Sequence, residues 1–237
     1  MSNLQGIISK SADNASTQFE TMAYLTTNAA NYNTNGFKSE RFENYLMPDG
    51  RIEGVERRDH STGVFMETRR PLYLGIDGAG FFPVTKSDGK VVYTRDGSFK
   101  LNSEGYLVTD DNYLVGDGIK LPHSYYKLNI AKDGVVSVIP ERDADEQVLG
   151  KIPLVNFNNP EGLKKLEGNK YTATNDSGEP ILMKDTKSIL QGNIERSNVN
   201  LFATVNDVLK INAGIIANTR IIKVVDELYR QAINLKQ

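Results

Sequence analysis

The chain has 237 residues, of which 39% are hydrophobic and 24% charged, and its formal net charge is -2 at pH 7. These values describe a protein with a packed core, and the near-neutral charge excludes the strongly basic surface that nucleic-acid phosphates require. No run approaches the roughly 18 apolar residues that a membrane-spanning helix needs. Because the chain has no Cys and only two His, disulfides, thiolate metal sites and thiol nucleophiles are excluded, and the composition argues against an enzyme.

The first segment, up to residue 30, predicts a long helix. It contains no Pro, and small or apolar residues recur in steps of three and four, the pattern of a coiled-coil seam: Leu4, Ile8, Ala12, Ala15, Phe19, Met22, Thr26 and Ala29. Asn33-Thr34-Asn35-Gly36 ends the pattern, and Gly36 is expected in the left-handed conformation that terminates helices. Most other positions are Ser, Thr, Asn or Gln, which support an exposed helix poorly, so this helix needs partners.

The middle of the chain has the turn signals of a β-rich domain. Residues 37–63 contain the mixed-sign run Glu53 to Asp59 and predict an extended, solvated connector. Beyond them, Asp88-Gly89, Asn102 to Gly105 and Asp133-Gly134 each separate two short apolar runs, which is the signature of β-hairpins. Residues 64–196 therefore predict an outer domain of short antiparallel strands.

The last segment, Val199 to Leu235, predicts a second and more apolar helix, with Ser197 or Asn198 as its N-cap. Its seam alternates steps of three and four through the following residues: Leu201, Thr204, Val208, Ile211, Ile215, Asn218, Ile222, Val225, Tyr229 and Ala232. Phe202, Leu209 and Ile216 lie off this seam. One partner helix cannot cover so broad an apolar surface, so we expect other subunits to cover the rest.

Together these patterns predict an α+β fold in which the two terminal helices pair as a coiled-coil-like tube domain around a central all-β domain. The expected organisation is a discontinuous helical assembly domain, residues 1–36 and 197–237, a connector at 37–63 and a β-rich outer domain at 64–196.

No catalytic, cofactor or metal site is predicted. The loop Gly75 to Gly80 has the order G-x-x-G-x-G and no helix after it, so a tight turn is expected rather than a phosphate cradle. Asp110, Asp111 and Asp117 lack calcium-loop spacing. His60 and His123 are isolated in the sequence, and structural roles are expected for them.

Several segments resemble one protein family in order along the chain. Asn28-Ala-Ala-Asn31-Tyr-Asn33-Thr34-Asn35-Gly36-Phe37-Lys38 is similar to the N-terminal signature of bacterial flagellar rod and hook proteins. Gln191 to Asn200, with Glu195 and Ser197-Asn198-Val199-Asn200 in it, is similar to the family's C-terminal block. Between them, Gly75 to Phe82, Tyr93 to Phe99 and Gly105 to Thr109 resemble consecutive family blocks.

The resemblance implies a non-enzymatic structural subunit of the basal-body rod, which polymerises helically through its terminal helices into a drive shaft and export channel. The implied partners are copies of itself, other rod and hook subunits, basal-body ring proteins and the flagellar type III export apparatus, with no nucleic acid and no direct membrane insertion. The implied place is the periplasm-spanning rod, reached without a cleaved signal peptide. Within the rod, the short connector favours a proximal over a distal position.

The residues expected to make assembly contacts are those of the two terminal motifs and of the second helix seam: Asn28, Asn31, Asn33, Thr34, Gly36, Phe37, Ser197, Asn198, Val199, Asn200, Leu201, Val208, Ile211, Ile215, Ile222, Val225 and Tyr229. Two alternatives stay open. One is a hook-type subunit of the same family, and the other is a cell-wall carbohydrate-binding β-domain with a helical oligomerisation handle.

Overall fold

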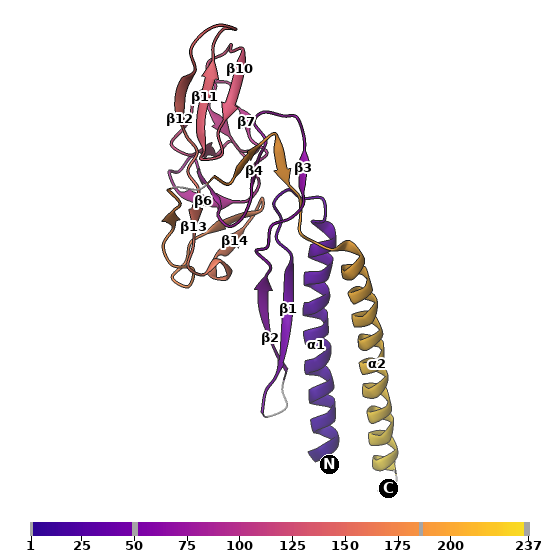
Figure 1. Ribbon diagram of the computed structural model, residues 1–237. Coiled ribbons are helices and arrows are strands. Elements are labelled where there is room, and N and C mark those ends of the chain that lie inside the picture. The colour runs from indigo at the N-terminus through magenta and orange to yellow at the C-terminus, as the bar shows by residue number, and fades with distance from the viewer. Residues whose placement is uncertain (1, 49–51, 185–186, 235–237) are drawn as a thin grey trace. The chain divides into compact units, whose positions relative to one another are not determined.

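The computed structural model describes residues 2–48, 52–184 and 187–234 (Figure 1). The chain divides into two compact units, which are described separately. Unit 1 consists of Met1–Tyr32, Ser39–Asp59 and Val199–Gln237, and unit 2 consists of Asn33–Lys38 and His60–Asn198. Both units are therefore assembled from segments that lie far apart in the sequence.

Unit 1 contains two long helices and one hairpin. Helix α1 (Ser2–Ala30) and helix α2 (Leu201–Asn234) lie side by side and run in opposite directions (Figure 1). Strands β1 (Glu40–Leu46) and β2 (Ile52–Arg58) pair antiparallel and lie along α1. Asn200 caps α2, because its side-chain oxygen accepts a hydrogen bond from the Ala203 N–H at 3.0 Å. The cap therefore lies two residues after the predicted Asn198.

The strands of unit 2 form one large sheet and several small ones. The seven-stranded sheet has the order β14-β15-β6-β5-β9-β8-β7, a three-stranded sheet has the order β10-β11-β12, and the pairs are β13-β16, β17-β4 and β18-β3. The bounds are β3 (Phe65–Glu67), β4 (Leu74–Ile76), β5 (Phe82–Thr85), β6 (Val91–Thr94), β7 (Lys100–Leu101), β8 (Leu107–Val108), β9 (Leu114–Val115), β10 (Lys127–Ile130), β11 (Val135–Ile139), β12 (Gln147–Lys151), β13 (Val155–Asn156), β14 (Lys164–Leu166), β15 (Lys170–Thr172), β16 (Ile181–Leu182), β17 (Ile189–Gln191) and β18 (Asn193–Glu195), with a short 3₁₀ helix η1 (Pro160–Gly162).

The predicted hairpins are present. β5 pairs with β6 across Asp88-Gly89, β7 pairs with β8 across Asn102 to Gly105, and β10 pairs with β11 across Asp133-Gly134. Gly89, Gly105 and Gly134 all have positive φ, which explains why glycine follows Asp or ends the turn there. The core behind these strands is apolar and includes the fully buried Leu74, Phe82, Val84, Leu107 and Val136.

The α+β class agrees with the structure, but the prediction of a coiled-coil-like tube domain beside one all-β domain is wrong. The face of α1 that meets α2 is polar and includes Asn14, Thr17 and Gln18, whereas Phe19 of the predicted seam is 60% exposed. A coiled coil requires apolar residues at these positions. The strands are also distributed over several sheets, and one hairpin belongs to the unit that contains the helices.

The stretch predicted as an extended connector, residues 37–63, contains the β1–β2 hairpin. Phe42 of β1 is sandwiched between two neighbours. Its ring stacks on Tyr24 of α1, with ring centroids 5.4 Å apart, and a Cβ atom added to Gly54 of β2 would lie 1.8 Å from Phe42 Cε1. Aromatic stacking and the bare glycine therefore fix the hairpin on α1. The predicted domain boundaries stay a prediction.

Candidate assembly site

Three charged residues from distant parts of the chain meet inside unit 2, and we call them the Glu195 cluster: Lys38, Arg95 and Glu195. All three side chains are at most 2% exposed. Glu195 ends β18, Arg95 follows β6, and Lys38 ends the Asn33–Lys38 segment. Each of these residues lies in a different one of the sequence segments that resemble the rod and hook family.

Both oxygens of the Glu195 carboxylate accept two hydrogen bonds. Oε1 lies 2.6 Å from Lys38 Nζ and 2.8 Å from the Gly63 N–H. Oε2 lies 2.8 Å from Arg95 Nε and 2.7 Å from Arg95 Nη2. Charge-assisted hydrogen bonds of this kind are the strong ones, and a buried carboxylate needs them to offset its lost hydration.

The cations of the Glu195 cluster also bind backbone carbonyls. Arg95 Nη1 donates to the carbonyl oxygens of Gly78 and Gly80, at 2.8 and 2.7 Å, and Nη2 donates to that of Ile76 at 3.0 Å. Lys38 Nζ donates to the Ser61 carbonyl at 2.6 Å. The glycine-rich loop 75–80 is therefore a turn held by a guanidinium group, which satisfies carbonyl oxygens that would otherwise be buried unpaired.

The cluster lies where both terminal segments of the chain join unit 2. The Gly36 N–H donates to the Glu195 carbonyl at 2.8 Å, and the Asn198 N–H donates to the Phe37 carbonyl at 3.3 Å. Arg196 Nη2 donates to Asn33 Oδ1 at 2.8 Å, and its Nη1 donates to Asn35 Oδ1 at 3.2 Å. The first and last motifs therefore bind each other directly, as the segments that lead to and from the two helices.

Gly36 has φ +62°, so the predicted left-handed conformation is present. It lies six residues beyond the end of α1 and serves a turn of unit 2 rather than the helix terminus. A Cβ atom there would lie 2.5 Å from the backbone carbon of Arg95. Conformation and close approach therefore both require glycine at this position.

The predicted site residues divide between the two units. The structure brings Asn33, Thr34, Gly36, Phe37, Ser197 and Asn198 together in unit 2, near the Glu195 cluster. Asn28, Asn31, Val199, Asn200 and Leu201 belong to unit 1. The Asn28 side chain makes two hydrogen bonds with the backbone at the start of the hairpin. Its Nδ2 donates to the Glu40 carbonyl at 2.6 Å, and its Oδ1 accepts from the Glu40 N–H at 2.8 Å.

The seam predicted on α2 is the face that packs against α1. The first residue of the predicted seam, Leu201, is 39% exposed. The following seam residues are buried or half-buried, as the apolar period predicted: Thr204, Val208, Ile211, Ile215, Asn218, Ile222, Val225 and Tyr229. Ile211 and Thr21 line the same cavity of about 240 Å³ between α1, α2 and β1. These residues therefore contact the chain's own α1, and contact of the same residues with neighbouring subunits stays a prediction.

The opposite face of α2 is apolar and exposed. We call the following residues the outward stripe: Phe202, Val205, Leu209 and Ile216. Phe202 is 79% exposed and Leu209 is 61% exposed. Ile221, Val224 and Leu228 are further exposed apolar residues toward the end of the helix. Exposed apolar residues gathered on one face of a helix are typical of interaction surfaces.

Sequence reasoning missed the Glu195 cluster, although all three of its residues lie in the segments that resemble the family. No local signal could have identified the cluster, because Lys38, Arg95 and Glu195 lie far apart in the chain and have mixed neighbours such as Ser39, Asp96 and Arg196. The outward stripe was visible as off-seam apolar residues on the second helix.

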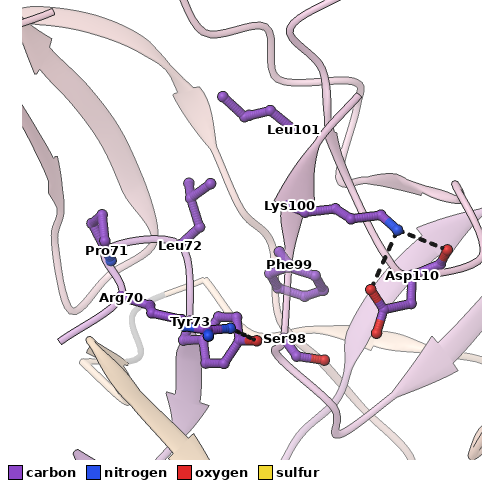
Figure 2. A pocket seen from close by; sticks show the side chains of 9 residues that line it. All are labelled: Arg70, Pro71, Leu72, Tyr73, Ser98, Phe99, Lys100, Leu101 and Asp110. Atoms are coloured by element: carbon purple, nitrogen blue, oxygen red, sulfur yellow. Dashed lines mark hydrogen bonds and ion pairs between the residues drawn. The ribbon is translucent and has the colours of Figure 1, made fainter. Parts of the chain in front are cut away.

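Unit 2 also has an open groove of about 500 Å³, and Figure 2 shows the side chains that line it. Two aromatic rings line the groove, and Phe99 is only 2% exposed. The other, Tyr73, is covered by Arg70, whose guanidinium lies 5.0 Å from the ring centroid and donates to the Tyr73 hydroxyl at 2.6 Å. Lys100 pairs with Asp110 on the other side of the groove. The Tyr73 ring is therefore not presented to a sugar, which weakens the carbohydrate-binding alternative.

One known family and several known proteins are similar in sequence to this chain. The family described as "Flagellar hook protein FlgE/F/G D1 domain" matches residues 75–138, which include Arg95 and the Gly75–Gly80 loop. The flagellar basal-body rod protein FlgG of Buchnera aphidicola subsp. Acyrthosiphon pisum is 32% identical over 242 residues, with 90% of this chain and 93% of the relative covered. The chain belongs to the flagellar basal-body rod proteins.

Two further rod proteins are similar to the chain over most of its length. FlgG of Bacillus subtilis strain 168 is 32% identical over 90% of this chain and 92% of its own length. The rod protein FlgF of Escherichia coli K12 is 26% identical over 90% of this chain and 91% of its own length. This rod protein is thus a structural subunit of the flagellar basal body, in a family of structural proteins. Among the described residues, neither helix is both long and apolar enough to cross a membrane.

Proposed function

We propose that this rod protein polymerises through the outward stripe of α2 and the neighbouring exposed surface of α1, where Phe19 is the large apolar residue. The observation that carries the proposal is the exposure of Phe202 and Leu209 on a helix whose opposite face already packs on α1. Each partner that covers such a side chain removes apolar surface from water, which stabilises the contact by about 25 cal/mol per Å². Heterologous contacts of this kind extend into a helical filament when they do not close into a ring.

In this proposal the helices of successive subunits build the shaft that transmits torque and surrounds the export channel. The Glu195 cluster contributes by fixing both terminal segments where they join unit 2. The proposed partners are copies of this chain and other rod and hook subunits, then basal-body ring proteins and the flagellar type III export apparatus. The proposed place is the periplasm-spanning rod, reached without a cleaved signal peptide, and no catalytic step is part of the role. A proximal position in the rod stays a prediction.

The test is replacement of Leu209 by Asp in a cell that carries no other copy of the gene. We expect loss of motility and of basal bodies with a complete rod, while purified Leu209→Asp keeps the unfolding midpoint of the parent, because position 209 is exposed in the subunit. The matched control is Asn212→Asp, which adds the same charge at an exposed position of the same helix without removing an apolar side chain.

Motility that survives in Leu209→Asp and also in Phe202→Asp would contradict assembly through the outward stripe. Loss of motility in the Asn212→Asp control would show that added charge, and not loss of apolar surface, prevents assembly, and would equally count against the proposal.

A further inference from the structure

We infer that Asn218, with Gln18 and Asn14, is the specificity determinant that pairs α2 with α1 of the same chain in one antiparallel register. The inference rests on the proposed function and deepens it. It identifies the residues that make one face of α2 pack on α1 of the same chain, so that the outward stripe can contact neighbouring subunits.

The three amides form a bonded set between the helices. Asn218 Nδ2 donates to Gln18 Oε1 at 2.8 Å, and Asn14 Nδ2 donates to Asn218 Oδ1 at 3.4 Å. Asn218 is 8% exposed, so its amide has exchanged water for these partners. An amide buried in this way is stable only where its partners are in place.

A glycine makes room for the same set one turn earlier on α2. A Cβ atom added to Gly214 would lie 2.7 Å from Gln18 Nε2. Gln18 therefore occupies the space that a side chain at position 214 would fill, and it reaches Asn218 from there. The pairing of a large amide with a bare glycine is a second feature that depends on register.

The apolar residues of the α2 seam do not specify a register by themselves. Ile211, Ile215, Ile222 and Val225 repeat along the seam, and branched apolar side chains of similar size pack in more than one alignment. A slip of one heptad would place Asn14 opposite Ile211 or opposite Val225 and would separate Asn218 from both of its partners. The slipped pairs would bury amides against apolar side chains, which disfavours them.

The polar set also distinguishes the two faces of α2. The outward stripe presents apolar side chains, and an α1 helix that packed on them would bury Asn14, Thr17 and Gln18 against apolar surface. A polar set on one face is therefore a device against pairing with the wrong face or with another copy.

The chain has no Cys, so pairs of introduced Cys report register without background. In the inferred register Thr21 lies opposite Ile211, and both line one cavity. Thr204 lies one heptad away on α2. The experiment compares the rates of intramolecular disulfide formation in dilute full-length protein for the Thr21→Cys/Ile211→Cys pair and the Thr21→Cys/Thr204→Cys pair, each with and without Asn218→Leu.

With Asn218 present, we expect the in-register pair to form its disulfide at least tenfold faster than the shifted pair, because Cys residues one heptad apart exceed disulfide reach. In Asn218→Leu, we expect this ratio to fall at least threefold and intermolecular disulfides to increase. The matched control is Asn212→Leu, the same substitution at an exposed position of α2, which should leave the ratio unchanged.

An unchanged ratio in Asn218→Leu would overturn the inference, as would slow disulfide formation in both pairs of the parent. The rates are measured on unassembled protein, whereas the proposed function is tested by motility of Leu209→Asp. Failure of one is therefore distinguishable from failure of the other.

Discussion

The two units differ in what they bury at their centres. Unit 2 has an apolar core and buries the Glu195 cluster, whose charges are paired within the chain. Unit 1 buries amides and hydroxyls between its helices and exposes large apolar side chains such as Phe202 and Leu209. The difference teaches that the polar contacts of unit 1 lie between its helices while large apolar side chains remain on its surface, which supports the proposal that neighbouring subunits cover that surface.

The largest expected effect is a loss of unfolding free energy when the Glu195 cluster is broken. Glu195→Gln leaves Lys38 and Arg95 buried without a carboxylate, and breaking a buried ion pair by removing one partner costs about 3–5 kcal/mol of unfolding free energy. Denaturant unfolding of the full chain measures the loss. The control is Glu179→Gln at an exposed position of the same unit, where a change of at most about 0.5 kcal/mol is expected. Equal stability of both variants would show that the cluster does not hold unit 2 together.

The second prediction separates backbone conformation from close packing where the terminal segments meet. Gly36 and Gly89 both have positive φ, but only Gly36 has backbone atoms where a Cβ would be. Gly89→Ala should cost about 1–2 kcal/mol for the left-handed conformation alone. Gly36→Ala should cost that amount and about 1–3 kcal/mol more for displacing Arg95. Equal losses of stability in Gly36→Ala and Gly89→Ala, measured by thermal or denaturant unfolding, would mean that the backbone around Gly36 accommodates a Cβ atom without added strain.

A smaller effect is expected at the hairpin of unit 1. Gly54→Ala would displace the Phe42 ring from Tyr24 and remove a stacked pair worth about 0.5–1.5 kcal/mol. Hydrogen exchange of residues 40–48 and 54–58 should become faster, and the exchange of unit 2 should not change. Tyr24→Ala removes the same stack from the other side, so the double variant should show less than the sum of the two effects. Simple additivity would argue against a shared stack.

The smallest effect is a pH dependence in unit 2. Burial raises the pKa of Asp96 above its ordinary value, although Ser98 donates two hydrogen bonds to the carboxylate. A raised carboxyl pKa means that the folded state binds the proton more tightly, so Asp96 reduces stability increasingly as the pH rises from about 4, the unfolded value, through the folded value. Asp96→Asn removes this penalty, so its stability relative to the parent should increase over that range. A difference that does not vary with pH would contradict the burial effect.

The same contrast explains what sequence could predict. The hairpins of unit 2 follow from local turn chemistry at Asp88-Gly89 and Asp133-Gly134, and the seam of α2 follows from a strong apolar period. The seam of α1 was assigned to the wrong face, because Phe19 points outward and Asn14 points inward. Apolar period identifies a face that will be buried, and it does not state whether the chain itself or a neighbour buries it.

Contacts between residues far apart in the chain could not be predicted from the sequence, for a different reason. Lys38, Arg95 and Glu195 are separated by 57 and 100 residues along the chain, and no local pattern relates them. The β1–β2 hairpin was missed because its strands carry many charges and therefore resemble a solvated connector. In both cases the deciding contact, a carboxylate between two cations or a ring over Gly54, is made by residues that have no periodic signature.

The most direct test of the central claim is the rate of thiol labelling at position 209 before and after assembly. The chain has no Cys, so Leu209→Cys provides a single thiol. In the unassembled subunit we expect it to react with a maleimide at nearly the rate of the same protein unfolded in denaturant, because the parent side chain is 61% exposed. In purified rods built from this subunit we expect labelling to slow at least tenfold, since a neighbouring subunit covers the position. Equal rates before and after assembly would contradict the claim that the outward stripe is the surface that neighbouring subunits complete.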